Sequence, residues 1–135
     1  MSAAELERSL SGSAIEYTHL PELGGRRRPS SGSPNGGWRN SQFQGYADHM
    51  ASAEFEAGLG RLTTLAGARP TAVMCAEAAW WRCHRRLVSD ALLVRGWSVD
   101  HIGSDGRVTE HELTPFAELG GGRLTYPPAQ RALDV

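Results

Sequence analysis

The predicted fold rests on residues 71–102, whose sequence is TAVMCAEAAWWRCHRRLVSDALLVRGWSVDHI. Residues 71–75 form a short and almost entirely apolar run, which is typical of a strand buried on both faces. Apolar residues then recur at spacings of three and four over residues 78–95, which predicts a helix that Gly96 closes. Residues 97–102 predict a second strand. The order strand, helix, strand favours an α/β fold with a mostly parallel sheet.

The residues before this stretch fit the same architecture. Residues 3–10 predict a short helix with apolar side chains on one face. Residues 15–20 alternate apolar and polar side chains, which predicts a strand that ends at Pro21. Residues 43–66 predict two helices, the second of them capped by Ser52.

A long loop and a short β element complete the predicted domain. Residues 24–37 contain five glycines, two prolines and three serines, which predicts a flexible loop. Residues 107–126 predict short strands around the glycines at 120–122. We therefore expect one small Rossmann-like domain over residues 1–135. In it, helices flank a mostly parallel sheet and a short β element follows at the C-terminus.

Composition narrows the class of protein further. All 14 basic residues are arginine, and the net charge of −1 argues against a protein that coats nucleic acid non-specifically. The sequence has no apolar run of about 20 residues for a membrane span, and residues 1–10 do not resemble a signal peptide. Two cysteines are too few for a disulfide scaffold, so they are candidate reactive thiols or metal ligands. We expect a cytoplasmic protein with no membrane partner.

Two segments of the chain are rich in arginine. Residues 26–39 contain four arginines and no acid, and residues 78–95 contain four arginines and one acid. Either segment alone is typical of a solvated surface. In a parallel sheet, however, ligands bind beyond the carboxyl ends of the strands. There the first predicted strand leads to Arg26 and Arg27, and the next leads to Cys75. The sequence therefore predicts a cleft for an anionic ligand.

Cys75 is the first candidate for a catalytic group. It would end a buried strand just before a helix, where the helix dipole, unpaired amides and nearby arginines favour a thiolate. The alternative is a small buried thiol, which is what most free cysteines are. Tyrosine phosphatases need an arginine six residues after their nucleophile. Here Trp81 holds that position and Arg82 follows it, so the similarity to a phosphatase loop is weak.

Three residues that follow Cys75 also carry chemistry. Glu77 is a candidate general base, or a carboxylate that stabilises the helix end. Cys83 and His84 lie about two turns into the predicted helix. His84 is either a cleft histidine that moves protons or a satisfied core histidine. A metal bound by Cys75, Cys83 and His84 is the least favoured option, because their spacing fits no compact ligand motif.

Other residues are candidates for holding the ligand. Tyr17 and His19 alternate onto one face of their predicted strand. Trp38, Arg39 and Tyr46 mix aromatic and basic groups, which suits a planar anion such as a nucleotide or a single strand. Ordinary packing of Trp38 and Tyr46 under a loop is an equally good alternative.

The chain also resembles a known family, domain-of-unknown-function family 488 (DUF488), over residues 13–128. The resemblance is most specific around the two cysteines and is carried by Tyr17-Thr18-His19-Leu20-Pro21-Glu22-Leu23-Gly24-Gly25-Arg26-Arg27, Trp38-Arg39-Asn40, Phe43-Gln44-Gly45-Tyr46-Ala47, Cys75-Ala76-Glu77, Cys83-His84-Arg85, His111, Leu113-Thr114-Pro115-Phe116 and Leu124-Thr125-Tyr126-Pro127. It implies a Rossmann-like α/β domain of the bacterial cytoplasm without an established activity. A link of the family to DNA repair or nucleic-acid metabolism is weakly supported.

The chain departs from the family at its N-terminus. Members of the family usually open with a strand carrying a Thr-Ile-Gly-His-Ser type motif, a helix, and a second strand ending in Asp-Val-Arg. None of these precedes the segment that starts here at Met1. The resemblance therefore implies either a late start codon or a shortened member. In a shortened member, unpaired sheet edges would invite homo-oligomers.

Together, the residues and the resemblance predict a polar cleft for an anionic, nucleotide-like ligand in a thiol-dependent enzyme of unidentified reaction and cofactor. The chemical groups are Cys75, Glu77, Cys83 and His84, and the ligand-binding groups are Tyr17, His19, Arg26, Arg27, Trp38, Arg39, Tyr46 and Arg85, with no metal ligand assigned. The alternatives are a non-catalytic nucleic-acid-binding module that uses the arginine loop and Trp38, and an inactive truncated member of the family.

Overall fold

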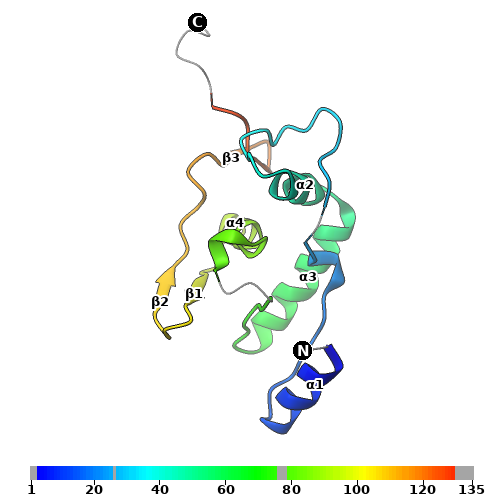
Figure 1. The fold of residues 1–135 in the computed structure, drawn as a ribbon, viewed down its shortest axis with the longest axis vertical. Helices are drawn as coiled ribbons and strands as arrows, with labels where there is room; N and C mark the ends of the chain where they lie inside the picture. The colour runs from blue at the N-terminus through cyan, green and yellow to red at the C-terminus, as the bar shows by residue number, and fades with distance from the viewer. Residues whose placement is uncertain (1–2, 26, 76–78, 130–135) are drawn as a thin grey trace, which may run out of the picture.

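The computed structural model describes residues 3–25, 27–75 and 79–129. The described elements are α1 (Ala3–Gly12), η1 (Pro21–Leu23), α2 (Ser41–His49), α3 (Ala53–Ala68), η2 (Trp80–Arg82), α4 (Arg85–Val94), β1 (Asp100–Ile102), β2 (Val108–Glu110), β3 (Glu118–Gly120) and β4 (Arg123–Thr125), where η denotes a 3₁₀ turn. Helix α4 lies between α2 and α3 on one side and the β1–β2 hairpin on the other (Figure 1). Helix α1 lies at one end of the molecule, away from α4.

The prediction of a mostly parallel, Rossmann-like sheet is wrong. The described strands form two separate two-stranded sheets, β1 with β2 and β3 with β4, and both pairs are antiparallel. In β1–β2 the register places Asp100 opposite Glu110 and Ile102 opposite Val108. Each pair is joined by a short turn, which antiparallel strands permit and parallel strands do not. The sheets are therefore local hairpins, and the core of the molecule is built by helices.

Of the three segments expected to be parallel strands, residues 97–102 contribute β1 to an antiparallel hairpin, and the other two belong to no described sheet. Residues 15–20 run as an irregular segment into η1, and residues 71–75 have no regular structure. Val73 is 44% exposed and Met74 is 66% exposed. A strand buried on both faces needs strands beside it and helices above and below. The apolar run at 71–75 pairs with no described strand, so its composition was a poor guide to its burial.

The helix predicted over residues 78–95 begins seven residues later, at Arg85. Before it come η2 and Cys83, whose backbone is extended with φ −136° and ψ 162°. The ring of Trp80 stacks on His101 at 3.7 Å between centroids, with an angle of 2° between the planes. This long-range contact holds Trp80 outside the helical stripe. The predicted end is confirmed, because Gly96 follows α4 with a φ of +89°.

Several predictions from local sequence signals are confirmed. Helix α1 forms where it was expected, and a break separates α2 from α3. The Ser52 hydroxyl caps α3 by accepting a hydrogen bond of 3.1 Å from the amide of Phe55. The short C-terminal β element is also present, and Gly121 and Gly122 supply the positive φ values that its turn requires.

The core lies between α2, α3 and α4 and is closed by residues from the loop and the C-terminal segment. Its buried members are Leu23, Trp38, Tyr46, Ala47, Met50, Phe55, Leu59, Leu62, Leu87, Val88, Ala91 and Tyr126. Trp38 makes edge contacts with Phe43 and Phe116, at 5.1 and 4.7 Å between ring centroids. The core thus joins residues from the middle of the chain to residues near its end.

The glycine-rich loop has a polar anchor that its composition does not reveal. The carboxylate of Asp48, in α2, accepts hydrogen bonds from the Ser30 amide, the Ser33 hydroxyl and the Asn35 side chain at 2.6 to 2.8 Å. The loop also passes close to Gly45, where a Cβ atom would collide with the carbonyl oxygen of Arg27. That the loop is flexible stays a prediction, but its path is held at these points.

Within the described residues, no helix has both the length and the apolar character that crossing a bilayer requires.

Candidate functional site

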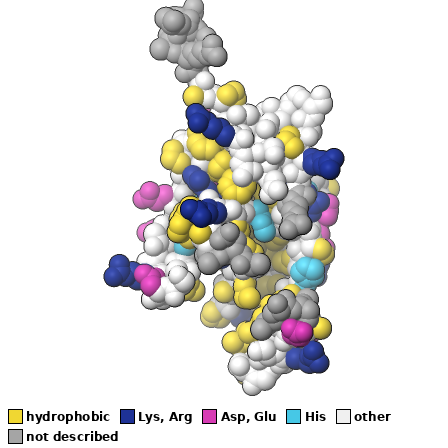
Figure 2. Space-filling model, viewed as in Figure 1, with side chains coloured by type: hydrophobic (Ala, Val, Ile, Leu, Met, Phe, Trp, Pro, Cys, Tyr) yellow, Lys and Arg dark blue, Asp and Glu magenta, His cyan; other side chains and the backbone are white. Residues whose placement is uncertain are grey.

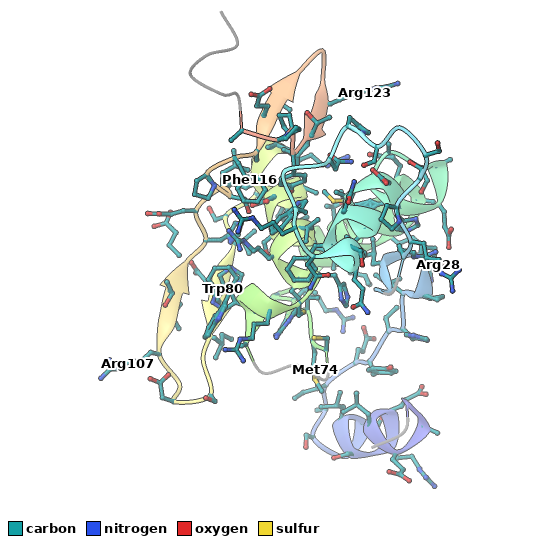
Figure 3. All side chains as sticks on the ribbon, turned by 45° about the horizontal axis from the view of Figure 1, so that its top comes forward. Arg28, Met74, Trp80, Arg107, Phe116 and Arg123 are labelled. Carbon is teal, nitrogen blue, oxygen red and sulfur yellow. The ribbon has the colours of Figure 1, made fainter. Side chains whose placement is uncertain are left out.

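The two cysteines lie side by side. The Sγ atoms of Cys75 and Cys83 are 3.1 Å apart, and neither cysteine is in a disulfide. Cys83 is buried and Cys75 is partly buried. In Figure 3, Met74 marks the segment that brings Cys75 to this place, and Trp80 lies between the β1–β2 hairpin and the start of α4. The sequence placed both cysteines in one cleft, and the structure brings them into contact.

Cys83 occupies the helix N-terminus that the sequence analysis gave to Cys75. Its Sγ accepts hydrogen bonds of 3.2 Å from the backbone amide of Arg85 and from Nε of the same residue. Burial raises the pKa of the Cys83 thiol, but hydrogen bonds from His84, Arg85 and Cys75 outweigh it and lower the pKa to about 6. A thiolate in this position also meets the positive end of the α4 dipole. Cys83 therefore has the properties of an activated thiol.

His84 and Tyr46 are neighbours of Cys83 and contact each other. Their rings lie 5.2 Å apart between centroids. Gly25 passes so close to His84 that a Cβ atom there would be 2.8 Å from Nδ1. The Tyr46 hydroxyl donates a 2.8 Å hydrogen bond to the carbonyl of Leu23, and burial raises the pKa of Tyr46 above its ordinary value. Tyr46 is thus a neutral, buried packing residue beside the thiol.

A buried polar network lies on the next part of α4, and the sequence analysis missed it. Asp90 accepts hydrogen bonds from His111 Nε2 at 2.7 Å, from the Thr114 amide at 3.1 Å and from the Tyr126 hydroxyl at 2.8 Å. His111 Nδ1 lies 2.7 Å from His101 Nε2. One signal could have revealed the network: Asp90 falls on the apolar stripe of its helix, and a buried carboxylate needs partners.

Arg85 connects the thiol pair to this network. Its guanidinium donates to Cys83, and its charge is also close enough to affect His101. Burial lowers the pKa of His101, and the charges of His111 and Arg85 lower it further, to about 4. His101 is therefore neutral at physiological pH. His111 links Asp90 to His101, because its Nε2 lies 2.7 Å from Asp90 Oδ1 and its Nδ1 lies 2.7 Å from His101 Nε2.

The structure does not gather all of the predicted site residues. Arg26 and Glu77 lie outside the described residues. Tyr17 is partly buried and His19 is exposed, on the irregular segment before η1, and Arg39 is exposed next to the start of α2. Tyr17, His19 and Arg39 were expected to line one cleft at the edge of a parallel sheet. The described residues form no such sheet.

Two further predicted ligand-binding residues have structural partners. Arg27 Nε donates to the carbonyl of Gly24 at 3.3 Å, and its guanidinium lies 3.7 Å from Glu54. Trp38 is buried in the core, and the guanidinium of Arg86 lies 5.1 Å from its ring centroid. On the face shown in Figure 2, the arginines are dispersed rather than gathered into one patch.

Two surface hollows of the described chain lie away from the thiol pair. One is lined by Thr18, Ala57, Gly60, Arg61, Thr64 and Leu65, and another by Pro115, Phe116, Ala117, Glu118, Pro127, Pro128 and Ala129. Neither includes a predicted site residue. In the described part of the chain, no three His, Cys, Asp or Glu side chains group as metal ligands would. The candidate functional site is therefore the thiol pair at the N-terminus of α4.

The fold and the site define a mostly helical protein with a thiol pair at the start of α4 and a buried Asp–His–His network behind it. The family model described as "Domain of unknown function DUF488" matches residues 1–92, and the chain belongs to that family. The expected family is therefore confirmed, although the match ends within α4 and the resemblance was expected to continue to residue 128. Neither curated proteins nor solved structures gave a match.

Proposed function

We propose that this protein is a thiol-dependent enzyme of the cytoplasm in which the Cys83 thiolate attacks an electrophilic centre of an anionic, nucleotide-like substrate. The observation that carries the proposal is the position of the Cys83 sulfur, which accepts two hydrogen bonds from Arg85 at the start of α4. Such an environment is typical of reactive cysteines rather than of inert buried ones. It favours Cys83, and not Cys75, as the nucleophile.

The neighbours of Cys83 support this chemistry. In the attack, Sγ forms a bond to the electrophile, and the leaving group departs with the electron pair of the bond that breaks. His84 is the adjacent group that can deliver a proton to that leaving group. Arg85 and the positive end of α4 favour negative charge on the substrate as well as on the sulfur. The reducing cytoplasm would keep both cysteines as the thiols that the site needs.

Alkylation kinetics test the proposal. Iodoacetamide should modify Cys83 at a rate that rises with pH through a midpoint near 6, measured in the Cys75→Ser variant so that only one thiol reports. Arg85→Gln should move the midpoint up by about one unit, because the thiolate loses the donated hydrogen bond and the positive charge. The rate should then fall by about tenfold at pH 5, below both midpoints, and by only about twofold at pH 7. Arg82→Gln is the matched control, since Arg82 is an exposed arginine of η2, and it should leave the rate unchanged.

Two outcomes would contradict the proposal. In one, Cys83 is modified only after the protein is unfolded. In the other, its rate has the midpoint of an ordinary thiol and Arg85→Gln does not change it. The anionic substrate is tested in the same assay, where inorganic phosphate and nucleoside monophosphates should slow alkylation of the native protein. Equal rates with and without these anions would remove the substrate class from the proposal.

A further inference from the structure

We propose that Cys75 and Cys83 form a reversible dithiol–disulfide couple that exchanges electrons with the disulfides of small thiols. This inference rests on the proposed function for the identity of the attacking thiolate, Cys83. It adds a second activity and a defined role for Cys75.

The distance between the two sulfurs carries the first step of the argument. At 3.1 Å the Sγ atoms are already in contact, and a disulfide of about 2.05 Å requires an approach of only about 1 Å. With Cys83 as thiolate, the S–H of Cys75 is the donor in this contact. The thiol that would resolve a mixed disulfide is therefore next to the sulfur that it must attack.

The setting of Cys75 allows this approach. Cys75 ends a segment, residues 71–75, that lies outside every described helix and strand. Its neighbours Val73 and Met74 are largely exposed, so moving this segment removes little core packing. Cys83, in contrast, is buried and held by two hydrogen bonds from Arg85. The approach can therefore come from residues 71–75, which contribute little to the core, toward a Cys83 that Arg85 holds in place.

The exchange balances in two steps. The Cys83 thiolate attacks one sulfur of a disulfide, forming a mixed disulfide and releasing the first small thiolate. Cys75 then attacks Cys83 Sγ, its proton passes to the second departing thiolate, and the Cys75–Cys83 disulfide forms. The two cysteines are oxidised and the small disulfide is reduced to two thiols. Hydrogen bonds that stabilise the Cys83 thiolate stabilise the reduced state, which makes the disulfide form an oxidant.

The experiment follows the redox state of the full-length chain in mixtures of reduced and oxidised glutathione. Samples are quenched with acid, free thiols are blocked with N-ethylmaleimide, and intact mass is measured. The wild-type chain should lose two hydrogens and leave no blockable thiol, and excess reduced glutathione should restore both. Cys75→Ser should instead accumulate a glutathione adduct on Cys83. Cys83→Ser should form an adduct at least tenfold more slowly than Cys75→Ser.

The possible failures can be told apart. A wild-type chain that collects only glutathione adducts, or that links to a second chain, overturns the couple. If Cys83 is alkylated rapidly in the same preparation, the proposed function stands and the couple alone is wrong. If the internal disulfide forms although native Cys83 is alkylated slowly, the couple stands and the activated nucleophile is wrong.

Discussion

The backbone of Cys83 is extended, and this conformation determines what the thiol can do. It lets Sγ turn back to the amide of Arg85, as the oxygen of a serine or aspartate does when it caps a helix. A sulfur in that position gains the same hydrogen bond and the same dipole as an oxygen cap. Unlike a hydroxyl, it becomes an anion near neutral pH. A capping position thereby becomes a candidate reactive centre.

His101 gives a test at low pH. Its pKa is about 4 in the folded protein and about 6.5 in an unfolded chain, so the unfolded state binds the proton first. Its contribution to stability is complete above pH 6.5 and is lost as the pH falls from 6.5 toward 4. We expect the unfolding free energy to fall by about 1–2 kcal/mol over this range because of His101. Urea unfolding at several pH values measures it.

The His101→Gln variant should be less stable at pH 7, and its stability should depend less on pH between 6.5 and 4. His19→Gln is the matched control, because His19 is exposed, and it should keep the wild-type pH dependence. A His101→Gln variant with an unchanged slope would show that another group causes the acid sensitivity.

Helix α2 organises the glycine-rich loop through one carboxylate. Burial raises the pKa of Asp48, but hydrogen bonds from Ser33, Asn35 and Ser30 outweigh it and lower the pKa. The folded loop therefore prefers the ionised form. Asn35 in turn accepts from the amide of Tyr126, so the loop, α2 and the C-terminal segment share one set of hydrogen bonds.

Asp48→Asn should loosen the loop without unfolding the helices. The amide loses the charge that strengthens three hydrogen bonds, and we expect a loss of about 1–3 kcal/mol. Hydrogen exchange should become faster at residues 30–37 and stay unchanged in α3. Asp105→Asn, which alters an exposed carboxylate in the β1–β2 turn, should change neither. Equal exchange in the loops of wild type and Asp48→Asn would show that the carboxylate does not anchor this segment.

Elements with local signals could be predicted from the sequence. Ser52 satisfies one amide in the first turn of α3, and Gly96 takes the positive φ after α4, so neither depends on distant residues. The apolar run at 71–75 and the helical spacing from 78 depend on what covers them. The parallel sheet was inferred from the order of predicted strands and helices, and one of those strands rested on the apolar run alone. Trp80 lies outside the expected helix, where it stacks on His101.

The candidate site was predictable in its residue types but not in its roles. The physical argument for a thiolate at a helix N-terminus was sound, and it applies to Cys83 because the helix begins at Arg85 rather than near Ala78. The pairing of Cys75 with Cys83 required the irregular path between them. His101 and His111 were not assigned to the site, because only the fold brings them to Asp90.

The molecule is closed by residues that come after the family match. The match ends at residue 92, yet three of the groups that hold Asp90 come from His111, Thr114 and Tyr126. Tyr126 is fully buried, and its carbonyl accepts a 2.7 Å hydrogen bond from the amide of Gly37. Residues after 92 therefore complete the core and the polar network of the segment that the family model matches.

A fragment of residues 1–96 should consequently fail to fold on its own. Without residues 97–135 it loses the buried ring of Tyr126, which contributes about 2–3 kcal/mol. It also leaves the Asp90 carboxylate without its partners, which costs about 3–5 kcal/mol. Together these losses approach the whole stability of a small domain, about 5–15 kcal/mol. Circular dichroism should show no cooperative thermal transition for the fragment, and adding residues 97–135 as a separate peptide should restore one.

The variant Tyr126→Phe of the full-length chain is the control, because it keeps the ring and loses only the hydroxyl, so it should fold with reduced stability. A fragment that unfolds cooperatively at the wild-type temperature would show that α4 and the thiol pair are held by the family segment alone.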